Sequence, residues 1–387
     1  MKIVVNAISA QTGGIVTYTN NLIEQALKHE IPLLIFVPRD FQELHPVPPG
    51  SDIEIRRCHA STYGPVRRFL WEQIVWRREV RNSKADILYS SANYGLLYSP
   101  LPQVLMIQGE ISFDPFYRKH TLPLLSYRER IAAALRRCLS AASARHSDIV
   151  VLPSRTAMEN VLSYSPSLRT KTIVNWPGVV ENFMQDIPKR PWRNEGGLSL
   201  FFHSVYYPHK APHGLVKAAQ ILREKGIDAR VRLTFEDRDF ENWDLGTDDL
   251  KILRQPQFTD FLKMGRIAHT DLPEALSQQD VFVFPSLSET FGFPMVEAMA
   301  ATIPVVAADT RINREICGDA ALYYEPDDPE DLARRIMELD QDPQLRTSFA
   351  GRQRARVREK YTWTLHFEKL IQDFRNLYAG QPPSVMD

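Results

Sequence analysis

Residues 280–300 read DVFVFPSLSETFGFPMVEAMA, and this stretch gives the clearest indication of the fold class. Four apolar residues follow Asp280 and stop at Pro285, which cannot continue the hydrogen-bond ladder of a strand. A polar loop comes next, and Pro294 suits the first turn of a helix, where its missing N–H is not needed. The stretch therefore predicts a buried strand, a loop and a helix, which is the repeating unit of a parallel α/β sheet.

The same alternation of apolar runs and amphipathic stretches occurs along the whole chain. We expect strands at residues 2–8, 31–37, 86–89, 103–107 and 148–152, and in a second series at 198–204, 230–235, 280–284 and 304–308. The run DIVVLPS at 148–154 repeats the form of DVFVFPS at 280–286, which we take to be an equivalent place in the second series. We predict an α/β protein with two Rossmann-like, doubly wound domains facing a central cleft, because ligands bind at the carboxyl ends of parallel strands.

A stretch rich in Pro and Gly separates the two series. WPG at residues 176–178 and PKRP at residues 188–191 are typical of an interdomain linker. We therefore predict domains at residues 1–185 and 186–362. Residues 363–387 form a final amphipathic helix that we expect to pack back on the first domain.

Length and composition exclude several classes of protein. The 387 residues are 44% apolar and 24% charged, which is ordinary for a globular protein of two domains. No apolar run approaches the roughly 20 residues of a membrane span, and the start MKIVVN is too polar for a signal peptide. The balance of 47 basic and 47 acidic residues gives no case for nucleic-acid binding. Three widely spaced cysteines favour neither disulfides nor a zinc cluster, so we expect a reducing cytoplasm.

The first half of the chain is more basic than acidic, chiefly in residues 67–81 and 128–145. Solvated helix faces are the ordinary explanation of such runs. The alternative is a basic face, bearing Trp71 and Trp76, that contacts the inner face of an anionic membrane. Both interpretations stay open at this point.

The stretch at 280–300 also carries groups that can bind a nucleotide. Backbone N–H groups at the start of its helix, from Thr290, Phe291, Gly292 and Phe293, can hold a phosphate. Glu297, one turn inside the helix, can accept hydrogen bonds from a ribose diol. Two glutamates spaced like Glu289 and Glu297 are most often only a solvated pair, but the residues around them favour a functional role.

This stretch resembles the signature of retaining nucleotide-sugar glycosyltransferases of the GT-B fold, specifically glycosyltransferase family 4, which is marked by two Glu separated by seven residues. Similar features continue through residues 272–286 and 303–320, and more weakly through GGIVTY at 13–18 and NWPGV at 175–179. The resemblance implies an enzyme that moves a hexose from a nucleotide-diphosphate sugar to a saccharide or lipid-linked acceptor in polysaccharide biosynthesis. It implies that the first domain binds the acceptor and the second the donor, with retained stereochemistry and neither a metal nor another cofactor.

The resemblance also implies roles for individual residues. Glu289 would lie near the transferred sugar and Glu297 would hold the ribose. Lys210 matches the family's basic residue on the diphosphate, and it would act with Glu289 in catalysis by stabilising the leaving group. The ordinary explanation of Lys210 is a surface lysine.

Further positions follow from the same match. Gly13 and Gly14 would let the first domain's backbone approach the diphosphate, although a tight turn also explains them. The loop with Arg266 and Ile267 would meet the base. The amides of Thr290, Phe291, Gly292 and Phe293 would bind the sugar hydroxyls and the phosphate.

Two positions depart from the family pattern. Ser204 stands where many relatives have an Arg on the diphosphate. Gln108 stands where they often have a His that contacts the sugar. Gln can hydrogen-bond a hydroxyl but cannot take a proton near neutral pH, so its role stays open.

Other functions are weaker interpretations of the sequence. Asp237 and Asp239 resemble the Asp-x-Asp metal site of the other major glycosyltransferase fold, but a solvated loop explains them. No Gly-x-Ser-x-Gly elbow supports a serine hydrolase. A nucleotide-sugar epimerase and an inactive, transferase-like binding subunit remain as alternatives.

UDP-glucose is the first expected donor and GDP-mannose the next, with a bacterial surface polysaccharide intermediate as the acceptor.

Overall fold

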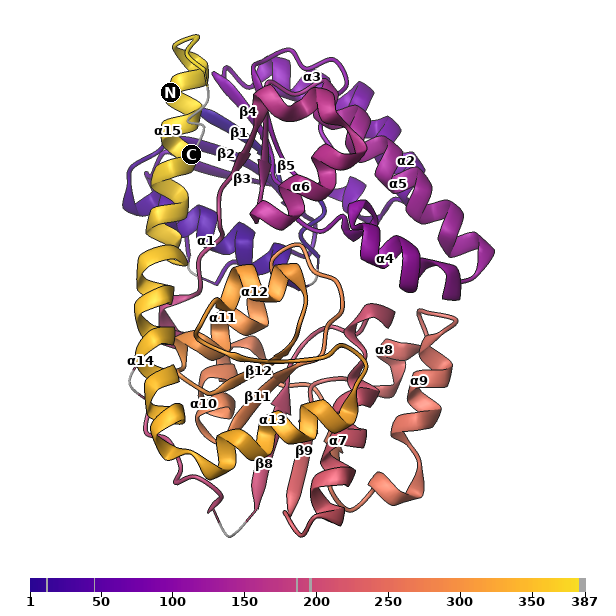
Figure 1. The fold of residues 1–387 in the computed structure, drawn as a ribbon. Helices are drawn as coiled ribbons and strands as arrows, with labels where there is room; N and C mark the ends of the chain where they lie inside the picture. The colour runs from indigo at the N-terminus through magenta and orange to yellow at the C-terminus, as the bar shows by residue number, and fades with distance from the viewer. Residues whose placement is uncertain (12, 45, 186, 195–196, 383–387) are drawn as a thin grey trace. The chain divides into compact units, whose positions relative to one another are not determined.

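The chain forms two compact units, each with its own parallel sheet (Figure 1). The computed structural model describes residues 1–382, except residues 12, 45, 186, 195 and 196. Unit 1 takes residues 1–114 and 131–178 and the C-terminal segment from Trp363, and unit 2 takes residues 115–130 and 179–362. Residues 115–130 thus cluster with unit 2, although the sequence analysis assigned them to the first domain. The central cleft stays a prediction.

The sheet of unit 1 is parallel and has the order β3-β2-β1-β4-β5-β6-β7. The order reverses between β1 and β4, which is where doubly wound sheets bind ligands. Its strands are β1 (Ile3–Asn6), β2 (Leu33–Pro38), β3 (Ile53–Cys58), β4 (Ile87–Ser90), β5 (Gln103–Met106), β6 (Ile149–Leu152) and β7 (Thr172–Val174).

Helices cover the faces of this sheet because each buries one apolar stripe against it. On one face, Val4 and Leu88 form a core with Trp76 and Val80. The helices of unit 1 are α1 (Gly14–Lys28), α2 (Pro65–Trp71), a π-helical turn (Glu72–Trp76), α3 (Arg77–Asn82), α6 (Arg155–Tyr164) and α15 (Trp363–Tyr378). α5 (Tyr127–Arg145) begins in unit 2 and continues in unit 1.

Unit 2 repeats the doubly wound plan with the order β10-β9-β8-β11-β12-β13, reversing between β8 and β11. Its strands are β8 (Leu198–Phe202), β9 (Ala229–Leu233), β10 (Leu262–Met264), β11 (Val281–Phe284), β12 (Val305–Ala308) and β13 (Leu322–Tyr324). Its helices are α4 (Pro115–His120), α7 (Pro212–Glu224), α8 (Asp237–Phe240), α9 (Gly246–Leu253), α10 (Leu272–Ser277), α11 (Phe293–Ala300), α12 (Arg311–Cys317), α13 (Pro329–Gln341) and α14 (Pro343–Lys360). The prediction of two Rossmann-like units is therefore confirmed.

An aspartate stands immediately before each of three buried strands and has a structural task there. Asp86, Asp148 and Asp280 each accept a backbone N–H within one residue of the start of the neighbouring strand, at 2.7 Å in every case. The repeated runs at 148–154 and 280–286 do not lie at equivalent places, however. β11 adjoins the point where its sheet reverses, and the strand in that place in unit 1 is β4, after Asp86, rather than β6.

The basic stretch at residues 67–81 presents aliphatic side chains to solvent, not aromatic ones. Trp76 is fully buried and Trp71, partly buried, packs against the same core, so the alternative interpretation is wrong in giving the basic face these two aromatic side chains. The exposed apolar side chains are Val66, Leu70, Ile74 and Val75. Together with Arg67, Arg77, Arg78 and Arg81 of the same helical stretch they form what we call the α2 surface.

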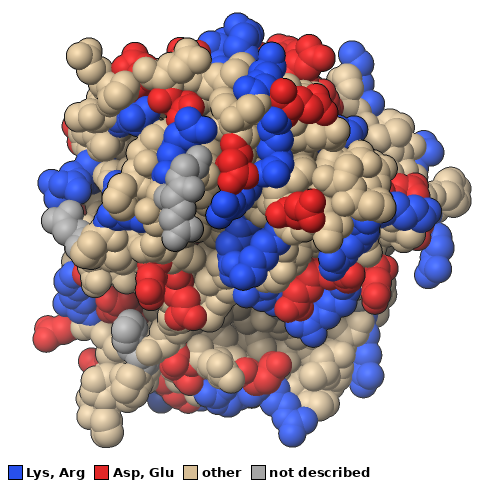
Figure 2. Space-filling model, turned by 90° about the horizontal axis from the view of Figure 1, so that it is seen from below, with Lys and Arg blue, Asp and Glu red and all other residues tan. Residues whose placement is uncertain are grey.

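Elsewhere the surface charge is mixed. Figure 2 shows one face on which Lys and Arg are interspersed with Asp and Glu. Such a face has no continuous positive field of the kind that holds a nucleic-acid backbone. Within the described part of the chain, every helix is either too short or too polar to span a bilayer.

Candidate functional site

Except for Arg266 and Ile267, which follow β10, the predicted site residues of unit 2 gather beyond the carboxyl ends of β8 and β11, where the sheet order reverses. The loop after β8 begins at His203 and leads to Lys210, and the loop after β11 begins at Pro285 and leads to Glu289. The two loops are joined because the Leu287 amide donates to the His209 carbonyl at 2.9 Å. The fold thus brings together two segments about 80 residues apart, at the place where α/β sheets bind ligands.

A sharp turn positions Lys210 at this edge. Lys210 ends a short 3₁₀ turn and is followed by Ala211, which has a positive φ of 43°. Pro212 then opens α7. A non-glycine residue in this region is strained, and such strain is retained where the surrounding structure imposes it.

Lys210 forms an ion pair with Glu289. Their side chains are only 8% and 11% exposed, and Lys210 Nζ lies 5.7 Å from the centre of the Phe284 ring. A buried cation left alone would be costly, so the carboxylate supplies its counter-charge. An incoming anion must therefore share Lys210 with Glu289 or displace it.

The predicted phosphate cradle is the N-terminus of α11. The helix begins at Phe293, and Gly292 caps it in the left-handed region with φ 91°. This φ is one that residues with a side chain rarely adopt, so the turn favours glycine; the nearest atom to an added Cβ would be Met295 Cε, the mobile end of a flexible side chain. Pro294 is in the first turn, as expected. The amides of Gly292 and Phe293 therefore lie at the positive end of the helix dipole, beside partly exposed Thr290 and buried Phe291.

Glu297 is buried between two imidazoles. His269 Nε2 lies 3.1 Å from its Oε1, and His203 Nε2 lies 3.4 Å from its Oε2. His203 packs against the ring of Phe282, with 5.2 Å between ring centres, and His269 against Phe183, with 5.4 Å. The carboxylate thus has a hydrogen bond to His269 on one side and the ring of His203, without a hydrogen bond, on the other.

Burial and pairing set the protonation of this group of three. Burial lowers the pKa of His203 to about 4, so its imidazole is neutral at pH 7. Burial is the largest single effect and opposes charge on His269 and on Glu297 as well, but their hydrogen bond and the attraction between opposite charges together outweigh it. The pKa of His269 is therefore raised above 6.5 and that of Glu297 lowered, which keeps the carboxylate ionised.

Sequence reasoning did not find the partners of Glu297. His203 follows β8, whereas His269 lies in a 3₁₀ turn after β10. Nothing in the sequence relates either histidine to Glu297. Only a fold that brings the ends of β8 and β10 to α11 can show this arrangement.

The remaining expected donor residues of unit 2 have other contacts. Ser204 is joined through its backbone to the hydroxyl of Thr234, and this contact provides no cation in place of the missing Arg. The Arg266 guanidinium pairs with Glu236 at 3.2 Å and with Asp239. Ile267 is partly buried in the loop that leads from β10 to His269. The same loop therefore carries Arg266 and Ile267, which are expected to meet the base, and leads to His269, which contacts Glu297.

The two aspartates of the alternative metal site, Asp237 and Asp239, have structural roles. Asp239 completes a capping box at the start of α8 with Glu236 and pairs with Arg266, while Asp237 pairs with Arg254. Across residues 1–382, leaving out the five that are not described, His, Cys, Asp and Glu form no group of three able to hold a metal ion.

Gly13, Gly14 and Gln108 belong to unit 1. Gly13 caps α1 with φ 69°, and Gly14 is the first residue of that helix. Gln108 follows β5, and its amide donates to Asn93 Oδ1 at 2.9 Å. These residues lie at the carboxyl edge of their own sheet, so within unit 1 they occupy the expected ligand-binding edge.

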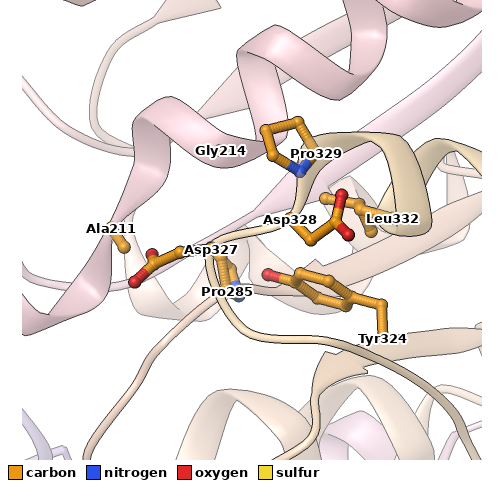
Figure 3. Close-up of a pocket in the computed structure, with 8 residues that line it drawn as sticks. All are labelled: Ala211, Gly214, Pro285, Tyr324, Asp327, Asp328, Pro329 and Leu332. Atoms are coloured by element: carbon orange, nitrogen blue, oxygen red, sulfur yellow. The ribbon is translucent and has the colours of Figure 1, made fainter.

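A small pocket adjoins the Lys210 turn in unit 2 (Figure 3). Ala211 and Gly214 line one side, Pro285 lies at the end of β11, and Asp327 is drawn close to Ala211. The others that line it are Tyr324, Asp328, Pro329 and Leu332. None of the charged groups of the Lys210–Glu289 pair lines this pocket, so it borders the site without containing its chemistry.

Part of the chain is similar to proteins of a known family. Residues 184–356 match the family described as "Glycosyl transferases group 1", and this segment contains all the unit 2 site residues. The O-antigen chain mannosyltransferase B of Escherichia coli is 28% identical over 170 residues. That match covers 43% of this chain and 42% of the relative, so it spans less than half of either protein.

Solved structures establish the fold of nearly the whole chain. Sucrose-phosphate synthase from Thermosynechococcus elongatus has a TM-score of 0.76 at 17% identity, covering 98% of this chain and 100% of that one. The Anabaena protein HepE, in complex with UDP and glucose, has a TM-score of 0.72 at 17% identity, covering 97% and 99%. The two Rossmann-like units therefore form the GT-B fold.

Proposed function

We propose that this protein is a glycosyltransferase that moves a hexose from a nucleotide-diphosphate sugar to a saccharide or lipid-linked acceptor. The observation that carries the proposal is the buried Lys210–Glu289 pair beside the N-terminus of α11, at the reversal point of the unit 2 sheet. A cation and a helix N-terminus together suit a diphosphate. A carboxylate at the same place suits sugar hydroxyls and the positive charge that develops on the sugar.

The proposed reaction uses these groups as follows. The bond between the sugar C1 and the phosphate oxygen breaks, and Lys210 with the α11 amides stabilises the charge on the leaving diphosphate. The acceptor oxygen bonds to C1, and its proton passes to the leaving phosphate. Glu289 contacts the sugar and Glu297 accepts from the ribose. Of the unit 1 residues, Gly13 and Gly14 approach the diphosphate and Gln108 hydrogen-bonds a hydroxyl.

The finer parts of the proposal rest on the resemblance to glycosyltransferase family 4 with its two glutamates. We propose retained stereochemistry, no metal requirement, and the loop of Arg266 and Ile267 against the base. UDP-glucose is our first candidate donor and GDP-mannose the second. The Escherichia coli relative is named as an O-antigen chain mannosyltransferase, which supports a role in surface polysaccharide synthesis and a test of GDP-mannose as donor.

The test measures binding first and turnover second. A nucleotide sugar that binds the folded protein at 100 times its Kd stabilises it by about 2.7 kcal/mol, which a thermal-shift screen of UDP-, GDP- and ADP-sugars detects. The best donor is then incubated with and without candidate saccharide acceptors. Release of nucleoside diphosphate that requires acceptor supports a transferase. Conversion of the sugar without acceptor supports an epimerase, and binding without turnover supports a binding subunit.

We also propose that the α2 surface contacts an anionic membrane, where a lipid-linked acceptor resides. Val66, Leu70 and Ile74 are 64%, 54% and 59% exposed and recur every four residues, so they share one side of the helical stretch. Arginines flank them. Exposed apolar side chains bordered by cations are typical of helices that lie in a membrane interface. On this proposal the protein works in the cytoplasm at the inner face of the membrane.

A further inference from the structure

The Glu297 carboxylate is held by a residue that the proposed reaction does not use. His269 Nε2 lies 3.1 Å from Oε1, within hydrogen-bond distance. The His269 side chain is 39% exposed, whereas that of Glu297 is 7% exposed. His269 therefore stands between a buried carboxylate and the solvent from which a ligand arrives.

The hydrogen bond from His269 leaves most of the accepting capacity of Glu297 free for a ligand. A carboxylate has about four acceptor sites on its two oxygens, and His269 occupies one of them. On the other side, the buried Nε2 of His203 has no hydrogen-bond partner among the described residues, and it lies 3.4 Å from Oε2. The carboxylate is thus oriented but unsaturated, and a polar atom beside it is unsatisfied. Two adjacent hydroxyls of a ligand can form hydrogen bonds with both the Glu297 carboxylate and His203 Nε2.

We propose that His269 is a positioning residue whose imidazolium holds the Glu297 carboxylate ionised and oriented to accept hydrogen bonds from the ribose diol of a nucleoside diphosphate. The inference rests on the proposed donor site and adds to it the residue that prepares Glu297. It also makes donor binding depend on the charge of His269.

The charges of the cluster determine the direction of this dependence. Among the described residues, the titratable groups that act on His269 and its partners include Glu297 on α11 and His203 and Lys210 in the loop after β8, and the ring of Phe183 packs against His269. With His269 protonated, Lys210 and His269 balance Glu289 and Glu297. Because the pKa of His269 is raised above 6.5, this balance holds below that pKa and is lost as the pH rises through it. The cluster then has a net negative charge and repels a diphosphate.

The experiment compares wild type with His269→Gln and His269→Ala by calorimetric titration of UDP, or of GDP if only GDP binds, between pH 6.5 and 9.5. We expect wild-type affinity to fall about tenfold over this range. Glutamine can still donate to Glu297, so His269→Gln keeps measurable binding but loses the pH dependence. His269→Ala binds about tenfold more weakly at pH 6.5, with the donor KM raised and kcat nearly unchanged. His146→Gln, at an exposed histidine of unit 1, is the matched control and should behave as wild type.

A second ligand separates the positioning of Glu297 from the general effect of charge on diphosphate binding. The 2′,3′-dideoxy nucleoside diphosphate has no diol, so wild type and His269→Ala should bind it equally at pH 9.5. Equal binding of the ordinary diphosphate by wild type and His269→Ala at every pH would overturn the inference while leaving the donor site intact. Failure of wild type to bind any nucleoside diphosphate would overturn both proposals.

Discussion

The Lys210–Glu289 pair is the residue-scale feature on which the proposed chemistry depends. Glu289 neutralises Lys210 before any ligand arrives. An anionic diphosphate that reaches Lys210 competes with this carboxylate, and a sugar hydroxyl that binds Glu289 releases the lysine for the phosphate. The pair therefore suits a ligand that carries a sugar and a diphosphate together better than either fragment alone.

The two glutamates should differ in which step they affect. Glu289→Gln removes the carboxylate but keeps a similar shape, and it leaves Lys210 available to an anion. We expect nucleoside diphosphate to bind this variant as tightly as wild type or a few times more tightly, while kcat falls by at least about 100-fold. Glu297→Gln should instead weaken diphosphate binding about tenfold with a smaller effect on kcat.

Calorimetric titration and initial-rate kinetics on the same preparations measure both effects. Lys210→Met is the complementary variant, and it should lose diphosphate affinity because the cation is gone. Weaker binding in Glu289→Gln together with a normal kcat would contradict the assignment of the two glutamates.

At the scale of elements, sequence reasoning missed the four edge strands of the two sheets. β3 and β7 flank the unit 1 sheet, and β10 and β13 flank that of unit 2. An interior strand is covered on both faces and paired on both sides, so it reads as a continuous apolar run. β3 reads IEIRRC, with exposed residues between the others, because an edge strand is partly open to solvent. All nine expected strands were found, and every one lies inside a sheet.

The α2 surface gives a prediction at the same scale. Leu70→Glu places a charge in the middle of the exposed apolar row, so vesicle binding should fall at least about tenfold. Arg78→Gln and Arg81→Gln should each weaken binding about fivefold on anionic vesicles only, because each removes about 1 kcal/mol of surface attraction. Co-sedimentation with phosphatidylglycerol and phosphatidylcholine vesicles at low salt measures this.

An exposed apolar residue elsewhere controls for the change of charge. Leu365 is 44% exposed on α15, and Leu365→Glu should bind vesicles as wild type does. If wild type fails to sediment with anionic vesicles, the proposed membrane contact is wrong and the α2 surface has another use.

At the scale of the whole molecule, the last helix of the chain returns to complete unit 1. In α15, His366 Nδ1–H donates to the Trp176 carbonyl, so Nε2 must accept from the Tyr18 hydroxyl at 2.8 Å. The Tyr89 hydroxyl then donates to Tyr18 at 2.6 Å. This buried chain of hydrogen bonds joins α1, β4 and α15 although the residues are up to 348 positions apart. The contacts of the Tyr18 hydroxyl and the Trp176 carbonyl with His366 form only when α15 is docked.

The network predicts a loss of stability in acid. Burial lowers the pKa of His366 to about 3, although the Trp176 carbonyl opposes the shift. The unfolded chain takes up the proton near pH 6.5, so this contribution is complete above pH 6.5 and is lost as the pH falls toward 3, at about 1.4 kcal/mol per pH unit. Gln can accept from Tyr18 and donate to Trp176, but it does not titrate.

Urea unfolding of wild type and His366→Gln at pH 7.5, 6 and 5 tests this prediction. The difference in unfolding free energy between the two proteins should change by about 1.4 kcal/mol per pH unit below pH 6.5. His146→Gln replaces an exposed histidine and should leave the wild-type slope unchanged. Parallel pH curves for wild type and His366→Gln would show that His366 is not held neutral.

Local pattern was sufficient for the inner strands, the stop at Pro285, and the helix start at Gly292 and Pro294. These depend on runs of apolar residues and on backbone conformations that a few neighbouring residues impose. The family resemblance predicted Glu289, Glu297 and Lys210 as site residues from the same local pattern, and the fold places Lys210 and Glu289 in an ion pair.

Long-range packing decided which side chains are buried and which distant residues meet. The direction of a side chain depends on what covers its face, so only the folded chain turns Trp71 and Trp76 inward and leaves Leu70 and Ile74 outside. Partners such as His269 and Glu297 meet because strand ends converge at one edge of a sheet, a distance relation that spacing along the chain does not encode.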